Sequence, residues 1–143
     1  MLQMKYIADY IYTFPTVTDL CTVFAWYPKG KNISQDTFIY PVLVTDDTSL
    51  FTNRGQTQRQ ATVRINVVPK TVLLSWEYEE GLVYEVFDAI NDAIVSKCPD
   101  GPRDYSGVSV LSVSSDDVWY NGYIQDRSIR SKQYTFIYSV SNG

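Results

Sequence analysis

The chain has 143 residues, of which 45% are hydrophobic and 15% aromatic, with 12 Lys and Arg against 16 Asp and Glu, a net charge of −4 and no histidine. This length is typical of a single domain, residues 1–143, with a core of its own. The scattered basic residues exclude a cationic stripe for a nucleic-acid backbone, and the missing imidazole removes the usual general base and the commonest metal ligand.

The first predicted element is a short amphipathic helix over residues 2–13, where apolar side chains recur at helical spacing. Pro15 is expected to end this helix. Residues 21–27 are rich in β-forming side chains and predict a first strand. The apolar runs are too short for a signal peptide or a membrane span, so we expect a soluble protein in a reducing compartment.

Two strands and a long connection are predicted next. Residues 37–45 predict a strand in which Pro41 lacks an amide donor and indicates an edge or a bulge. The polar stretch at about 46–60 predicts a long loop, and loops of that length are commonly functional. The strict alternation of residues 61–68 predicts a half-buried strand.

The clearest helix signal spans residues 77–97. Its apolar residues fall on one helical face: Val83, Val86, Phe87, Ile90 and Ile94. The opposite face is acidic, and acids at the start with Lys97 at the end suit the helix dipole. A helix with one apolar stripe needs a sheet or another helix to bury that stripe, and the other long segments predict strands or turns. We therefore expect this helix to pack on a sheet.

The last third of the chain predicts further strands at residues 107–113, 118–125 and 132–141, with Asn121 and Gly122 as a turn or bulge inside the second of them. Strands on both sides of one main helix indicate an α+β fold. The expected architecture is a mostly antiparallel sheet covered on one face by the main amphipathic helix, plus a short N-terminal helix.

No set of residues with a catalytic pattern is found in the sequence. The pairs at residues 46–47 and 116–117 are interpreted as solvated turn acids, because neighbouring strand side chains point to opposite faces. Phosphate-binding glycine loops and serine nucleophile motifs are absent. Cys21 and Cys98 are interpreted as buried free thiols, with a disulfide as the alternative. We therefore expect no enzyme activity, no cofactor and no metal.

The aromatic run at residues 119–123 has two interpretations. It is either a stacking platform for bases or sugars, or a twisted strand end whose rings pack on neighbouring elements, and the second is favoured because basic partners are few. Arg127, Arg130 and Lys132 follow this run. They are expected to blunt a strand edge or to pair with acids of another chain.

The order of these elements resembles the tail terminator or tail-completion proteins of long-tailed bacteriophages. The resemblance is one of layout over nearly the whole chain: an N-terminal helix, a strand pair broken by the long loop at about 46–60, the acidic amphipathic helix and the terminal strand RSKQYTFIYSV. No residue-level functional motif carries over, because this family lacks a signature motif.

The resemblance implies a structural virion protein that forms a ring, typically of six copies, on the tail tube. Its partners would be further copies of itself, the tail tube protein and the head-tail connector. It would be assembled in the host cytoplasm and lie at the head-tail junction, with DNA passing through its lumen without sequence-specific contact. The residues expected to make assembly contacts lie in the predicted loop: Asp46, Asp47, Leu50, Phe51, Arg54 and Arg59.

Two alternatives stay open at this point. A neck or adaptor subunit that binds the portal side has a similar build, and co-purification with tail tubes rather than filled heads distinguishes the two. A small ligand-binding α+β domain belongs to a different class. A well-formed apolar pocket with converging polar groups would favour that alternative.

Overall fold

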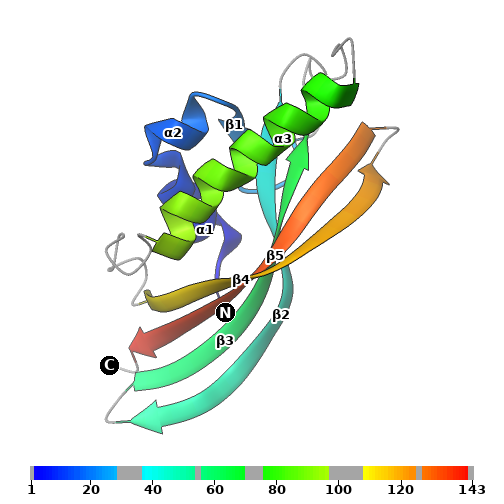
Figure 1. Ribbon diagram of the computed structural model, residues 1–143. Helices are drawn as coiled ribbons and strands as arrows, with labels where there is room; N and C mark the ends of the chain where they lie inside the picture. The colour runs from blue at the N-terminus through cyan, green and yellow to red at the C-terminus, as the bar shows by residue number, and fades with distance from the viewer. Residues whose placement is uncertain are drawn as a thin grey trace.

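The computed structural model describes residues 2–28, 37–53, 56–69, 76–96, 108–124 and 127–141. The elements follow in the order α1 (Met4–Tyr12), α2 (Pro15–Thr18), β1 (Thr22–Val23), β2 (Phe38–Asn53), β3 (Gln56–Val68), α3 (Trp76–Ile90), the π-helical turn η2 (Asn91–Ser96), β4 (Val108–Ile124) and β5 (Arg127–Ser141). Figure 1 shows long, twisted strands beside these helices.

The strands form one five-stranded sheet in the order β1-β2-β3-β5-β4. All pairings are antiparallel except the short parallel contact between β1 and β2. The fold is therefore α+β with a mostly antiparallel sheet, as predicted.

The alternation of β3 defines the two sides of the sheet. Every second side chain is fully buried: Ala61, Val63, Ile65 and Val67. Thr62 and Arg64 between them are only half-buried, because successive strand side chains point to opposite sides. We call the side with the buried aliphatic residues the core-facing side, and the other the opposite side. On β5, the core-facing side carries Tyr134, Phe136 and Tyr138, which are also buried.

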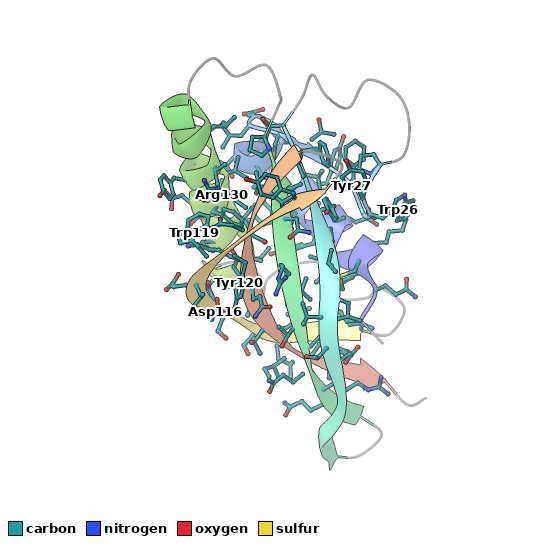
Figure 2. The ribbon with its side chains drawn as sticks, turned by 90° about the vertical axis from the view of Figure 1, so that its right-hand side faces the viewer. Trp26, Tyr27, Asp116, Trp119, Tyr120 and Arg130 are labelled. Atoms are coloured by element: carbon teal, nitrogen blue, oxygen red, sulfur yellow. The ribbon has the colours of Figure 1, made fainter. Side chains whose placement is uncertain are left out.

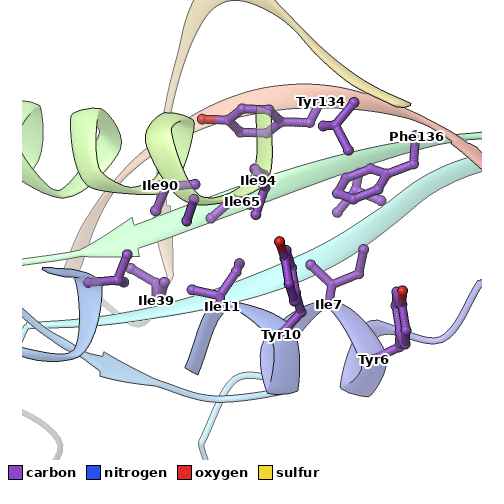
Figure 3. Packing of buried hydrophobic residues seen from close by; sticks show 14 of the residues in the cluster. Tyr6, Ile7, Tyr10, Ile11, Ile39, Ile65, Ile90, Ile94, Tyr134 and Phe136 are labelled. Carbon is purple, nitrogen blue, oxygen red and sulfur yellow. The ribbon is translucent and has the colours of Figure 1, made fainter. Parts of the chain in front are cut away.

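The helices contribute to the same core cluster as the core-facing side. From α3 and η2 come the residues predicted as the apolar stripe, all of them buried: Val83, Val86, Phe87, Ile90 and Ile94. Figure 3 shows Ile90 and Ile94 gathered with Ile65 and Tyr134. Each fully buried side chain of this size stabilises the fold by about 1.5–3 kcal/mol relative to an exposed one. The Tyr134 hydroxyl donates a hydrogen bond of 2.6 Å to Asn91 Oδ1, which joins η2 to β5.

The first predicted helix is confirmed as α1, whose buried face is apolar and includes Tyr6, Ile7, Tyr10 and Ile11. Pro15 does not simply end the helical region, because it starts the short helix α2. A proline fits the first turn of a helix, where its missing N–H would have no intrahelical acceptor.

The predicted loop at residues 46–60 is wrong. Strands β2 and β3 are paired at both ends of this stretch, from Asp46 opposite Ala61 to Asn53 opposite Gln56, with an irregularity between Asp47 and Phe51. Only residues 54–55 between the strands lie outside the described residues. The error has a physical cause: threonine and glutamine fit a strand well when one side of it is exposed, so a polar stretch is not evidence of an unpaired backbone.

The predicted first strand at residues 21–27 is paired over only two residues, Thr22 and Val23. Beyond it, Phe24 and Tyr27 pack with a second cluster of buried residues on the opposite side of the sheet: Phe38, Tyr40, Val68 and Ile129. The rings meet edge to face, with centroids 5.6 Å apart for Phe24 and Phe38 and 5.5 Å for Tyr27 and Tyr40. Phe24 and Tyr27 thus pack their rings against this cluster, whereas Trp26 in the same segment is 68% exposed.

Two predicted strands, at 107–113 and 118–125, are one strand, β4. Asn121 and Gly122 are not a turn or bulge, since they pair regularly with Arg130 and Ile129 of β5. The irregularities of β4 lie earlier, between Val110 and Ser112 and between Ser115 and Trp119.

Candidate assembly interface

The residues predicted to make assembly contacts lie in or beside the β2–β3 hairpin. Asp46 on β2 and Arg59 on β3 are fully described, and Arg54 lies outside the described residues. Three others are described as β2 backbone only, with no side-chain description: Asp47, Leu50 and Phe51. The structure thus places the described members of this set on strands rather than on a loop.

Asp46 forms hydrogen bonds within the chain, so it is not the solvated turn acid that the sequence predicted. Its Oδ1 and Oδ2 atoms accept bonds of 2.6 Å and 2.8 Å from the Tyr138 hydroxyl, and Oδ2 accepts a bond of 2.9 Å from the Leu2 amide. Leu2 and Tyr138 are both buried. The Asp46 carboxylate therefore joins β2 to β5 and to the segment that leads into α1.

Arg59 lies next to this acid, directly opposite Tyr138 on the core-facing side. Burial raises the pKa of Tyr138 to about 12, the hydrogen bond and charge of Asp46 act in the same direction, and the guanidinium of Arg59 opposes them. The three side chains come from three adjacent strands, β2, β3 and β5. Neither Asp46 nor Arg59 is isolated on a loop tip.

The opposite side of the sheet is polar over its middle. One row of hydroxyl-bearing residues crosses four strands in register: Thr45, Thr62, Thr135 and Ser114. Beside this row, Arg64 Nη2 donates a hydrogen bond of 2.8 Å to Gln133 Oε1, and its guanidinium carbon lies 4.6 Å from the centre of the Tyr120 ring. The opposite side therefore presents hydroxyl and amide groups around Arg64, whose guanidinium already contacts Gln133 and Tyr120.

The aromatic run at 119–123 divides between the two sides of the sheet. Trp119 lies beside α3, with its ring centre 5.3 Å from that of Tyr84 and 5.1 Å from that of Phe87 (Figure 2). Tyr120 stacks under Arg64. The favoured interpretation, rings packing on neighbouring elements, is confirmed for these two residues. Tyr123 is instead 79% exposed.

The sequence predicted that Lys132 blunts a strand edge, and this is wrong, because Lys132 lies on the inner strand β5. It is buried at 9% exposure, with Nζ 4.5 Å from the centre of the Trp119 ring and 3.7 Å from Asp117 Oδ1. Lys132 lies two residues before Tyr134 on β5, and strand residues two apart point to the same side, so the sequence itself indicates that Lys132 is on the core-facing side. Arg130 donates a hydrogen bond of 2.8 Å to Asn121 Oδ1, and the Arg127 side chain is outside the description.

The carboxylates at 116–117 are exposed, as predicted, but they sit at the second irregularity of β4 rather than between strands. Asp117 has a φ of 55°, and its amide donates to Ser115 Oγ at 3.1 Å. The Val118 amide donates to Asp116 Oδ1 at 3.0 Å. These local bonds satisfy amides that the interrupted ladder leaves without partners.

Exposed aliphatic side chains lie on β4, an edge strand of the described sheet, and on β2, whose outer side is paired with β1 only at Phe38 and Ile39, a feature that sequence reasoning missed. Val42 and Val44 on β2 are 39% and 44% exposed, and Leu111 and Val118 on β4 are 42% and 49% exposed. Val44 and Leu111 are the extra residues of two β-bulges. At each bulge, two residues of one strand lie opposite a single residue of its partner. Pro41 also lies on β2, just beyond the residues paired with β1, which agrees with its predicted edge position.

Cys21 is a buried free thiol, while Cys98 lies outside the described residues. Burial raises the pKa of Cys21 from 9.0 to about 12, so the reactive thiolate stays scarce until the pH approaches 12.

In a Cys98→Ser variant at pH 8, we expect a thiol reagent to label Cys21 in the folded protein roughly a thousandfold more slowly than in the protein unfolded with urea. Equal labelling rates in the two states would contradict the buried position.

No family model matches this chain, and no curated protein matches it either. Within the part of the chain that the structure describes, no helix combines the length and the apolar character needed to span a membrane. The same described residues hold no group of acidic, cysteine or histidine side chains arranged to bind a metal ion.

Proposed function

We propose that the protein is a structural subunit of a bacteriophage virion, which assembles as a ring on the end of the tail tube and joins the tube to the head connector. The observation that carries the proposal is the pair of sheet edges with exposed aliphatic side chains: Val42 and Val44 on one, Leu111 and Val118 on the other. Apolar groups on open strand edges favour association with another protein chain.

The order of the elements supports the same function. The structure has an N-terminal helix, two paired strands, a main helix and a terminal strand, as in the layout that resembles phage tail terminators, but a hairpin stands where that layout was expected to have a long loop. In this proposal α1 and α3 cover the core-facing side of the sheet. The opposite side, with its hydroxyl and amide groups, stays available to partners, and its described residues include few cations to bind DNA phosphates. DNA would then pass the ring without sequence-specific contact.

Native mass spectrometry and electron microscopy of the purified protein test this proposal. The expected result is a closed ring, because cyclic symmetry uses every lateral contact surface and ends further growth. Mixed with tail tubes, the rings should cap the tube ends, whereas filled heads that lack tails should not retain the protein by themselves. A strict monomer that stays monomeric even with tail tubes would overturn the proposal.

A further inference from the structure

The two open edges of the sheet run in opposite directions. Strand β2 is antiparallel to β3, β3 to β5, and β5 to β4. Strand β5 therefore runs in the same direction as β2, and β4 runs in the opposite direction. When copies of the chain are related by rotation about an axis along the strands, the β2 edge of one copy therefore meets the β4 edge of the next as an antiparallel pair.

Within the described residues, both edges are open over most of their length. Strand β1 pairs with β2 only at Phe38 and Ile39, and in the described sheet β4 has β5 as its one neighbour. Protective edges usually carry charges, especially lysine, near their bulges. Here the extra residues at the first bulge of β2 and of β4 are Val44 and Leu111, both more than 40% exposed, while charges, Asp116 and Asp117, occur at the second irregularity of β4. Covering an exposed aliphatic side chain with another protein chain is favourable, because it removes apolar surface from water.

From this polarity we infer that neighbouring copies in the proposed ring pair edge to edge, with β2 of each copy beside β4 of the next. The inference rests on the proposed ring and specifies its contact. Pairing of two β2 edges around a two-fold axis is also antiparallel, but it leaves both β4 edges and their aliphatic residues uncovered. The β2-to-β4 contact uses both edges of every copy, so only a closed ring leaves none of them open.

Cross-linking tests which edges meet. In a background with Cys21→Ala and Cys98→Ser, a double variant carries Val44→Cys and Leu111→Cys. A short bismaleimide should convert its native assembly into a ladder of covalent oligomers, and peptide mass spectrometry should identify links between position 44 of one copy and position 111 of the next. The reagent does not join the two introduced thiols of one chain, because three strand spacings of about 4.8 Å separate the edges.

Three controls make the result specific. The single variants Val44→Cys and Leu111→Cys should give no covalent dimer, since each edge then meets an edge without a thiol. A matched double variant, Tyr12→Cys with Asp88→Cys, places two exposed thiols away from both edges and should give no ladder.

A ladder with links between positions 44 and 111 supports the edge pairing. A ring seen by native mass spectrometry without those links, or with links between two copies of position 44, overturns the edge pairing and leaves the ring intact. A protein that stays monomeric with and without tail tubes overturns the ring, and the edge pairing with it.

Discussion

Replacing Phe87 by alanine is expected to lower the free energy of unfolding by about 3–5 kcal/mol, the usual cost of removing a buried aromatic ring. Phe87 is 1% exposed and lies in the main core cluster. Its ring also meets Trp119 edge to face at 5.1 Å and lies 5.9 Å from Lys132 Nζ. The substitution thus leaves a cavity and removes part of the aromatic surface around a buried cation.

Urea unfolding measures this loss, at several protein concentrations so that self-association does not add to the apparent stability. The matched control is Tyr84→Ala on the same helix. Its ring is 5.3 Å from that of Trp119, yet Tyr84 is 51% exposed, and we expect a loss of less than about 1 kcal/mol. Equal losses in the two variants would contradict the view that burial in the core, rather than the Trp119 contact, holds α3 in place.

Replacing Asp46 by alanine is expected to cost about 2–4 kcal/mol. The change leaves the Tyr138 hydroxyl and the Leu2 amide without their acceptor, and each unsatisfied buried donor costs about 1–3 kcal/mol. The double variant Asp46→Ala with Tyr138→Phe should lose less than the sum of the single losses, because the hydroxyl that needs the acceptor is then gone.

Chemical denaturation of the single and double variants measures the coupling. Asp88→Ala, an exposed acid on α3, is the control and should stay within about 0.5 kcal/mol of the parent protein. Strictly additive losses would show that Asp46 and Tyr138 stabilise the fold independently, against the observed hydrogen bonds.

The main helix and the core were predictable because their signals are local. The five residues of the apolar stripe repeat at helical spacing, and all are buried as expected. The alternation of β3 likewise indicated its buried core-facing residues, Ala61, Val63, Ile65 and Val67. In each case one face of the element needs burial and the other does not, so periodicity alone identifies the core-facing residues.

The hairpin and the candidate interface were not predictable in the same way. Residues 46–60 are polar, and a polar stretch fits a strand with one exposed side as well as it fits a loop, so the sequence does not distinguish the two. Lys132 was misjudged because a cation is normally placed in water, whereas here Trp119, Phe87 and Asp117 surround it. The exposed residues at the edges depend on bulges, which exist only once two strands are paired.

The bulge at Val44 decides which side chain reaches Tyr138. Leu43 pairs with Val63 and Thr45 with Thr62, so Val44 has no residue opposite it on β3. A related chain without this residue would pair regularly and keep its acid opposite Ala61 on the core-facing side, whereas a chain of the same length without the bulge would turn the acid to the other side. An ungapped alignment of this chain with the shorter one would pair residues from opposite sides of the sheet. The apparent exchange of aspartate for threonine at this position would then reflect a difference in chain length rather than a difference in chemistry.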